Sequence, residues 1–362
     1  MTATHTFGRA ALAAALSAAC TLAAGNAGAA DWYPLKVDIW DPPFDFSKPR
    51  QQAEYTPLAK ASAPHKICVS FPHLKDAYWL GVDYGIIDEA KRLGVKVQLL
   101  EAGGYTELSK QISQIEDCTS GGAAAIIIGA ISYDGLNNVV AELKKKKIPV
   151  VDVINGMSSP ELGAKSLVSF ADMGSKAGVF LAKQHPAGSK PVKVAWLPGP
   201  AGAGWVESGH KGFMEAVKGS AVEIVDVKYG DTGKEVQAKL VEDVLQAHPD
   251  LDYIAGTAVT AEAAVPILRA RGLADKVKLV AYYYTPGVDQ YIRRGAVLAA
   301  PTDSPVIQGR VALDQAVRLA EGKIELRHVG PIIEVVTKDN VSKIDMSTTL
   351  APASFKPTFT TN

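Results

Sequence analysis

From residue 66 onward, short apolar runs alternate with amphipathic helical patterns. The first apolar runs cover residues 67–71, 96–100, 124–128 and 149–154, and helical patterns separate them at about 76–93, 108–115 and 135–146. These runs are continuous rather than strictly alternating, which is typical of parallel strands that are buried on both faces. The pattern in this half of the chain therefore predicts a doubly wound α/β sheet.

The same pattern then restarts. Further runs cover residues 192–197, 223–227, 251–255 and 277–282, with helical patterns near 208–218, 234–247 and 259–271. Repeated βα units with right-handed crossovers build parallel sheets, so two successive sets predict two α/β lobes. Ligands of such sheets bind beyond the carboxyl ends of the strands, and the loops that follow the strands are the place to look for a site.

The first 65 residues do not follow this pattern. Residues 1–30 contain Arg9 and then an apolar stretch at 10–24, which predicts a secretory signal peptide rather than an uncleaved anchor. The mature chain is expected to begin near Ala30 or Asp31, in the periplasm. Residues 31–65 are rich in proline and aromatic residues. We predict that this N-terminal extension wraps one lobe, and contact with a partner is the alternative.

Three cysteines bear on the compartment. Cys20 lies inside the predicted signal, which leaves Cys68 and Cys118 in an oxidising environment where a disulfide is the default. Two buried thiols are the alternative. No CxxC spacing occurs, which argues against redox or zinc chemistry.

Composition and motifs argue against several classes of function. Basic and acidic residues both number 38, so no excess of charge indicates nucleic acid or an anionic membrane as a partner. The seven histidines are scattered without metal-ligand spacing. Glu207 stands where a dinucleotide-binding loop beginning at Gly202 would need its third glycine. We therefore expect no catalytic residue, no metal and no cofactor, and we predict that the chain is not an enzyme.

Aromatic residues are few but lie at the predicted strand-to-helix turns. They include Tyr78 and Trp79 after the first strand, Tyr105 after the second, Phe170, and the run Tyr282 to Tyr284. Packing at the lobe edges is the simpler explanation. Converging aromatic faces would instead form a cage that attracts a quaternary ammonium group. Asp76 and Asp303 could add a negative field or accept hydrogen bonds.

Several strings resemble the TorT family of periplasmic trimethylamine N-oxide sensors, and the resemblance covers nearly all of the mature chain. They are Phe71-Pro72-His73-Leu74-Lys75-Asp76-Ala77-Tyr78-Trp79-Leu80, Leu100-Glu101-Ala102-Gly103-Gly104-Tyr105, Leu197-Pro198-Gly199-Pro200 and Ala255-Gly256-Thr257-Ala258. The resemblance implies a type I periplasmic binding protein with two Rossmann-like lobes joined by three hinge crossings, near Asp172, Asp303 and residue 333. The N-terminal lobe would comprise 66–172 plus 304–332, and the C-terminal lobe 173–303 plus 333–362.

The resemblance also implies a ligand site. Tyr78, Trp79 and Tyr283 match the residues expected around the trimethyl head, with Asp76 and Asp303 nearby. Phe170 departs from the tryptophan usual in the family. Trp205 departs as well, and would either line the cleft or cap its loop. Sugar-binding members carry an aspartate at the position of Tyr283 and an arginine at that of Glu207, and the loss of both polar groups argues against a sugar.

The implied function is ligand sensing. The protein would bind trimethylamine N-oxide or a related small amine in the inter-lobe cleft and signal to the periplasmic domain of a TorS-like sensor histidine kinase. A solute-binding subunit of an ABC importer, for a sugar or another small solute, is the alternative. Neither implies a nucleic acid partner or stable membrane insertion.

Overall fold

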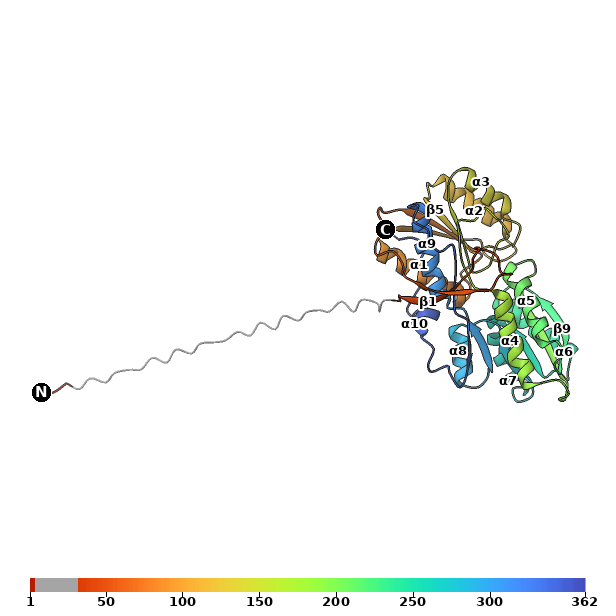
Figure 1. Ribbon diagram of the computed structural model, residues 1–362. Coiled ribbons are helices and arrows are strands. Elements are labelled where there is room, and N and C mark those ends of the chain that lie inside the picture. The colour runs from red at the N-terminus through yellow and green to blue at the C-terminus, as the bar shows by residue number, and fades with distance from the viewer. Residues whose placement is uncertain (4–31, 362) are drawn as a thin grey trace. The chain divides into compact units, whose positions relative to one another are not determined.

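The computed structural model describes residues 1–3 and 32–361 (Figure 1). The predicted signal peptide lies almost entirely outside the described residues. Within the described part of the chain, no helix combines the length and the apolar character needed to cross a bilayer. Residues from Trp32 onward form one compact unit, which contains two sheets.

The first sheet has eight strands in the order β2-β1-β13-β7-β6-β5-β3-β4. Their bounds are β1 Leu35–Ile39, β2 Gln51–Tyr55, β3 Lys66–Phe71, β4 Lys96–Glu101, β5 Ala125–Ile128, β6 Val150–Val153, β7 Ala164–Ser166 and β13 His328–Pro331. The six strands from β13 to β4 pair in parallel, as the continuous apolar runs predicted.

Helices cover both faces of this sheet. They are α1 Ala77–Leu93, α2 Leu108–Ser120, α3 Asn137–Lys145 and α9 Pro305–Ala320. Successive residues of a strand point to opposite faces. In β3, Ile67, Val69 and Phe71 join the large core cluster that contains α1, whereas Cys68 packs with α2 and α3.

The second sheet has six strands in the order β14-β12-β11-β10-β8-β9. Its strands are β8 Val192–Gly199, β9 Val222–Tyr229, β10 Tyr253–Gly256, β11 Lys278–Ala281, β12 Ala299–Thr302 and β14 Glu334–Thr337, and its helices are α4 Phe170–Gln184, α5 Gly204–Val217, α6 Lys234–Ala247, α7 Ala258–Ala270 and α8 Pro286–Arg293. Helices α4 and α5 lie very close together because glycines meet at their contact. A Cβ on Gly174 would overlap the carbonyl oxygen of Gly209. The two sheets confirm the predicted two-lobed α/β fold.

The chain crosses between the lobes at residues 167–169, 303–304 and 332–333, and it crosses once more when it leaves β14 for the C-terminal tail. We expected the first crossing near Asp172, and it lies a few residues earlier. Helix α4 has already begun at Asp172, because Ser169 caps it by accepting a hydrogen bond from the Asp172 backbone N–H at 3.2 Å. The second contains Ser304, whose φ of 52° is in the left-handed region. Residues other than glycine seldom adopt this backbone conformation.

The N-terminal extension adds two antiparallel strands to the first sheet. β2 pairs with β1, and β1 pairs with β13. Beyond β1, Trp40 stacks on His328 at a ring-centroid distance of 4.2 Å, and the Phe44 backbone N–H donates to His328 Nδ1 at 3.2 Å. Burial and the charge of Lys165 lower the pKa of His328 to about 3, so the ring is neutral and available as an acceptor.

The C-terminal tail does not stay in the second lobe, where we expected all of 333–362. After β14 the chain returns to the first lobe, where the short helix α10 (Met346–Thr349) packs against α9. The Leu99 backbone N–H donates to the Phe359 carbonyl oxygen at 2.8 Å, and Thr361 N–H donates to that of Val97 at 3.0 Å. The tail satisfies backbone groups at the outer edge of β4, a gain that local sequence pattern does not reveal.

The predicted disulfide is confirmed. Cys68 in β3 and Cys118 in α2 are bonded, with their Cα atoms 5.8 Å apart. Both are buried in the cluster beneath α2 and α3.

Candidate functional site

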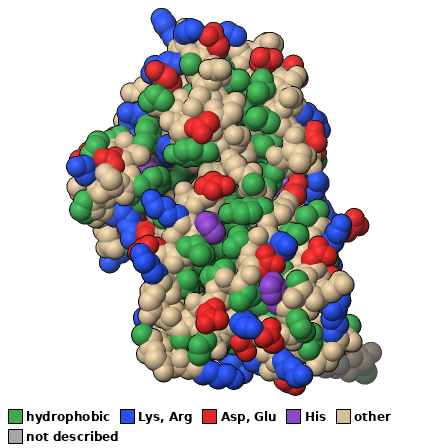
Figure 2. Space-filling model, turned by 90° about the vertical axis from the view of Figure 1, so that its right-hand side faces the viewer, with side chains coloured by type: hydrophobic (Ala, Val, Ile, Leu, Met, Phe, Trp, Pro, Cys, Tyr) green, Lys and Arg blue, Asp and Glu red, His purple; other side chains and the backbone are tan. Residues whose placement is uncertain are grey.

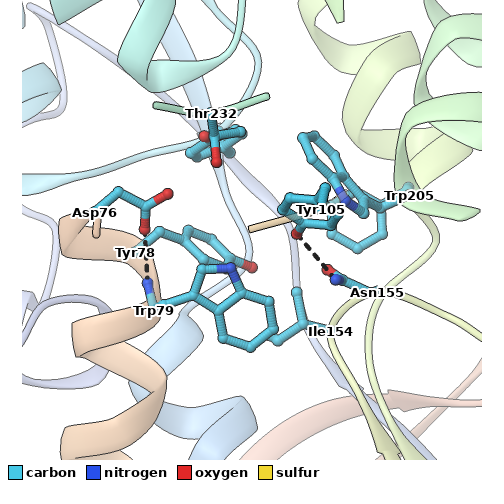
Figure 3. A pocket seen from close by; sticks show the side chains of 10 residues that line it. Asp76, Tyr78, Trp79, Tyr105, Ile154, Asn155, Trp205 and Thr232 are labelled. Atoms are coloured by element: carbon cyan, nitrogen blue, oxygen red, sulfur yellow. Dashed lines mark hydrogen bonds between the residues drawn. The ribbon is translucent and has the colours of Figure 1, made fainter. Parts of the chain in front are cut away.

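A pocket of about 280 Å³ lies between the two sheets, and both lobes contribute to it (Figure 3). Its lining residues lie in loops that follow strands or in the first turns of helices, where the fold predicts a ligand site. The lining residues are Asp76, Tyr78, Trp79, Tyr105, Ile154, Asn155, Phe170, Trp205, Thr232 and Tyr283.

Five of the six site residues predicted from the sequence lie in this lining. Asp76, Tyr78 and Trp79 come from the start of α1, Phe170 from the start of α4, and Tyr283 from the loop after β11. The sixth, Asp303, is fully buried behind the pocket wall. It accepts hydrogen bonds from Tyr78 Oη at 2.5 Å and from Gln308 Nε2 at 2.7 Å, so it fixes the Tyr78 ring.

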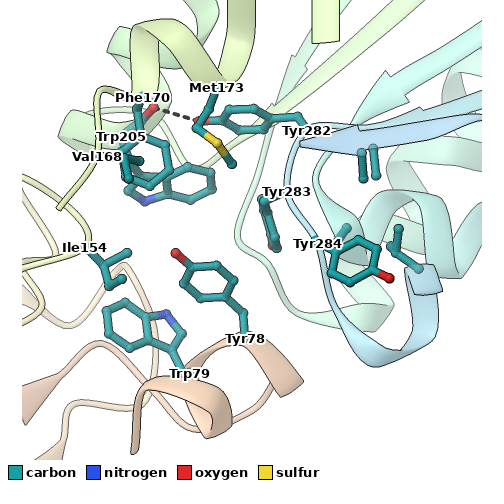
Figure 4. Packing of buried hydrophobic residues seen from close by; sticks show 14 of the residues in the cluster. Tyr78, Trp79, Ile154, Val168, Phe170, Met173, Trp205, Tyr282, Tyr283 and Tyr284 are labelled. Carbon is teal, nitrogen blue, oxygen red and sulfur yellow. Dashed lines mark hydrogen bonds between the residues drawn. The ribbon is translucent and has the colours of Figure 1, made fainter. Parts of the chain in front are cut away.

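The aromatic rings enclose the pocket from several directions (Figure 4). Tyr78 meets Tyr283 edge to face across the lobes, with ring centroids 5.1 Å apart. Tyr78 also lies edge to face against Trp79 at 6.2 Å. Trp205 lies 6.0 Å from Tyr283 and 6.1 Å from Phe170. Such rings present their electron-rich faces and apolar surface to whatever occupies the space between them.

Asp76 is both a helix cap and the acidic group of the pocket. Its Oδ1 accepts the Trp79 backbone N–H at 3.0 Å, which fixes the start of α1. Burial raises the pKa of Asp76, and the neighbouring His73, the Trp79 backbone N–H and Thr232 oppose that rise. A carboxylate held in such surroundings favours a ligand with positive charge on its exposed atoms.

A chain of polar groups connects Asp76 to the other lobe. His73 Nδ1 accepts the Lys75 backbone N–H at 3.2 Å, so Nε2 carries the proton and donates to Thr232 Oγ1 at 2.9 Å. The Thr232 hydroxyl in turn lowers the pKa of Asp76. Since His73 and Asp76 belong to the first lobe and Thr232 to the second, these polar interactions form only when the lobes lie together.

Sequence reasoning missed part of the lining. Tyr105 was noted as an aromatic residue at a turn, but Ile154, Asn155 and Thr232 gave no signal. Asn155 Nδ2 donates to Tyr105 Oη at 3.0 Å and to the Ala130 carbonyl oxygen at 2.7 Å. Ile154 has a φ of 69°, which is rare for a β-branched residue and is typical of strain held at functional sites.

Trp205 lines the pocket rather than serving only as a cap on its loop. Helix α5 begins at Gly204, four residues before the start expected from the pattern. The sequence did not indicate this start because Ala203 has no side chain that could cap the helix. Glu207 is exposed and accepts the Gly202 backbone N–H at 3.2 Å. It therefore supplies no polar group to the pocket.

The described lining holds an acidic residue but no lysine, arginine or histidine. On the face drawn in Figure 2, basic and acidic side chains are interspersed over both lobes. The selectivity of the pocket must therefore come from its own walls. A small, apolar, acid-lined cage suits an alkylated amine better than an anion or a sugar.

A second pocket of about 560 Å³ adjoins the first, and the two share Asn155, Phe170 and Trp205. Phe44 and Phe46 of the N-terminal extension lie on its far side. Arg50 of the extension also pairs with Asp172 of α4 at 2.5 Å. The extension thus contacts both lobes beside the first crossing.

Comparisons with known families and with known proteins agree with each other. A model of the periplasmic binding protein domain matches residues 67–324. The periplasmic protein TorT of Escherichia coli strain K12 is 37% identical over 306 residues, which are 84% of this chain and 86% of TorT.

Solved structures give the same fold with two different descriptions. An ABC transporter solute binding protein from Bradyrhizobium sp. BTAi1, with bound Bis-Tris, is 61% identical, covers 92% of this chain and 100% of its own, and superposes with a TM-score of 0.79. TorT in complex with the TorS sensor domain, solved in the absence of ligand, is 37% identical, covers 82% of this chain and 99% of its own, and has a TM-score of 0.73. The same complex solved in the presence of TMAO also has a TM-score of 0.73. These relatives are described as binding or periplasmic proteins rather than as enzymes.

Proposed function

This chain belongs to the periplasmic binding protein family, and on that premise we propose that it binds trimethylamine N-oxide, or a related small amine, between its lobes and signals to a TorS-like sensor histidine kinase. The observation that carries the ligand assignment is the aromatic pocket with one carboxylate and, among its described lining, no basic residue. The pocket is small, which suits a ligand of few atoms.

The chemistry of the pocket supports an alkylated nitrogen. The methyl groups of an N-oxide carry part of the positive charge of the nitrogen, and the faces of Tyr78, Trp79 and Tyr283 attract such groups. Each contact of this kind contributes about 0.5 to 2 kcal/mol. Phe170 adds apolar surface at the same wall. TMAO and Bis-Tris, named with two of the related structures, both contain a fully alkylated nitrogen.

Binding would be coupled to lobe closure through contacts that cross the cleft. His73 meets Thr232, and the Tyr105 backbone N–H donates to Asp231 Oδ2 at 3.3 Å. A ligand shifts the equilibrium between open and closed forms only by its difference in affinity for the two forms. A ligand that touches both lobes has that difference, and the closed surface is what a partner would recognise.

The second candidate function is a solute-binding subunit of an ABC importer, which would use the same closure to deliver its ligand to a permease. The solved relative at 61% identity is described as an ABC transporter solute binding protein, and this favours the importer as strongly as TorT favours the sensor. The ligand chemistry argued above is the same in both cases.

Calorimetric titration of the mature protein with trimethylamine N-oxide, choline and ribose tests the ligand assignment. We expect heat from the N-oxide, little from ribose, and loss of binding in Trp79→Ala. Trp40→Phe is the matched control, because Trp40 stacks on His328 outside the pocket. No heat and no thermal shift at millimolar N-oxide would refute the assignment.

A second measurement separates the two partners. The sensor hypothesis predicts that the protein forms a complex with the periplasmic domain of a TorS-like kinase in gel filtration, with or without ligand. The importer hypothesis predicts ligand-stimulated ATP hydrolysis when the protein is added to a reconstituted cognate permease. Absence of a complex together with stimulated hydrolysis would replace the sensor by the importer.

A further inference from the structure

Among the residues that the structure describes, none accepts a hydrogen bond from the Trp205 indole N–H, although this group is buried at the wall of the pocket. The side chain is 4% exposed, and Nε1 is buried without a partner among the described residues. The few buried donors that lack a partner in native proteins call for an explanation, because their loss of hydration is not compensated by a hydrogen bond. In Figure 4 the Trp205 nitrogen lies on the side of its ring that faces Ile154 and Tyr78, toward the pocket.

A second polar hydrogen is available at the same place. Tyr105 Oη accepts a hydrogen bond from Asn155 Nδ2, so its own hydrogen is free to donate, and the described residues offer it no acceptor. The Tyr105 and Trp205 rings lie 6.1 Å apart, and both line the pocket. Burial raises the pKa of Tyr105, which keeps its hydroxyl protonated and able to donate, while the Asn155 hydrogen bond opposes that rise.

We propose that Trp205 and Tyr105 form a donor site that binds an oxygen atom of the ligand and makes the protein selective for amine N-oxides over quaternary ammonium ions. This inference rests on the proposed function and specifies the ligand class. The donors lie on the Asn155 side of the pocket, whereas Asp76 at the start of α1 supplies the carboxylate. An N-oxide matches both, because its oxygen accepts hydrogen bonds and its methyl groups carry positive charge.

The two donors come from different lobes. Tyr105 follows β4 in the first lobe, and Trp205 lies in the first turn of α5 in the second. An oxygen held between them would join the lobes through hydrogen bonds, which a compound without an oxygen cannot form. The site therefore predicts discrimination in closure as well as in affinity.

The test compares two ligands of nearly the same shape, trimethylamine N-oxide and tetramethylammonium, in which a methyl group replaces the oxygen. Both are titrated calorimetrically into the wild-type mature protein, Trp205→Phe and Tyr105→Phe. We expect the wild type to prefer the N-oxide. Each variant should lose about tenfold or more in affinity for the N-oxide, as expected for a hydrogen bond to a charged acceptor, and keep its affinity for tetramethylammonium within about threefold.

The ratio of the two affinities separates hydrogen bonding from packing, since a packing defect weakens both ligands alike. Trp40→Phe, which removes an indole outside the pocket, should leave the ratio unchanged, and thermal melting of each variant reports folding. If the wild type binds the N-oxide and both variants keep its ratio, the donor site is refuted while the proposed function stands. If the wild type binds neither compound, the proposed function fails and this inference fails with it.

Discussion

Asp76 shows how one residue connects local structure to binding. It caps α1 through the Trp79 backbone N–H, and it is the carboxylate of the described pocket lining. Because α1 begins with Tyr78 and Trp79, the cap also sets the position of two rings of the cage. A change at Asp76 therefore acts on charge and on geometry together.

Ligand affinity should depend on pH through Asp76. Its raised pKa means that the carboxyl takes up a proton at a higher pH than usual, and the neutral form attracts a positively charged head less. We expect affinity for the N-oxide to fall as pH is lowered through this pKa, in titrations between about pH 5.5 and 8, where the N-oxide itself remains unprotonated. Asp76→Asn, which keeps an acceptor for the cap, should bind more weakly and with a flat pH profile. A pH dependence that persists in Asp76→Asn would assign it to another group.

The Thr232 hydroxyl should contribute to closure. Thr232→Val keeps the shape of the side chain but removes the hydroxyl that meets His73 Nε2 across the lobes. We expect calorimetry to show about a fivefold to tenfold loss in affinity, corresponding to about 1 kcal/mol, while Thr232→Ser retains wild-type affinity. Equal loss in both variants would mean that the methyl group, not the hydroxyl, is what matters.

Among individual residues, the sequence indicated those whose type is unusual for their position. Aromatic residues at turns, as at Tyr78 and Tyr283, stand out because an α/β core is filled mainly by aliphatic side chains. Asn155 and Thr232 do not stand out, since polar residues are ordinary in loops. Only the packing of the two lobes brings them to the pocket.

Among the elements, α1 connects the pocket to the C-terminal tail. Asp83, two turns after Asp76, is fully buried and accepts the Thr358 backbone N–H at 2.9 Å. Its second oxygen has no partner among the described residues. Burial raises the pKa of Asp83 to about 7.

This carboxyl should make stability depend on pH. Between about pH 4 and 7 the folded protein holds a proton on Asp83 that the unfolded chain has released, so stability falls as pH rises through that window. Asp83→Asn keeps an acceptor for Thr358 and removes the titration. We expect the variant to gain on the wild type between pH 5 and pH 8, by up to about 3 kcal/mol, in urea unfolding at both values. A gain independent of pH would contradict this.

The disulfide should stabilise the fold without affecting the pocket. It joins β3 to α2 across 50 residues, and the chain-entropy model assigns such a loop about 4 kcal/mol. Cys68→Ala combined with Cys118→Ala should therefore unfold at lower urea concentration and retain its affinity for the N-oxide. Loss of affinity in a variant that still melts cooperatively would connect the bond to the site.

Most elements were predictable because their apolar patterns are local. The helix expected at 234–247 matches α6, and the strand expected at 96–100 falls one residue short of β4. The start of α5 was missed because no capping side chain precedes Gly204, and the return of the tail was missed because its partner strand lies more than 250 residues earlier. Sequence patterns report periodicity well and long-range pairing poorly.

For the whole molecule, the arrangement of the lobes predicts a change of shape on binding. The lobes are joined only by short connections and the returning tail, and the contacts between Tyr78 and Tyr283 and between His73 and Thr232 require that they meet. We expect small-angle X-ray scattering to give a smaller radius of gyration with trimethylamine N-oxide than without it. The change should be absent with ribose and absent in Trp79→Ala. An unchanged radius in a protein that binds the N-oxide would mean that the lobes close before the ligand arrives.

The C-terminal tail has one further consequence. The outer edge of β4 would otherwise offer a row of unpaired backbone groups to any neighbouring chain, and exposed strand edges are where sheets of separate molecules join into aggregates. The hydrogen bonds of Leu99 to Phe359 and of Thr361 to Val97 occupy part of that row. The tail thus covers part of an edge at which two molecules could otherwise pair, and we expect an affinity tag fused directly to this end to leave that edge more open.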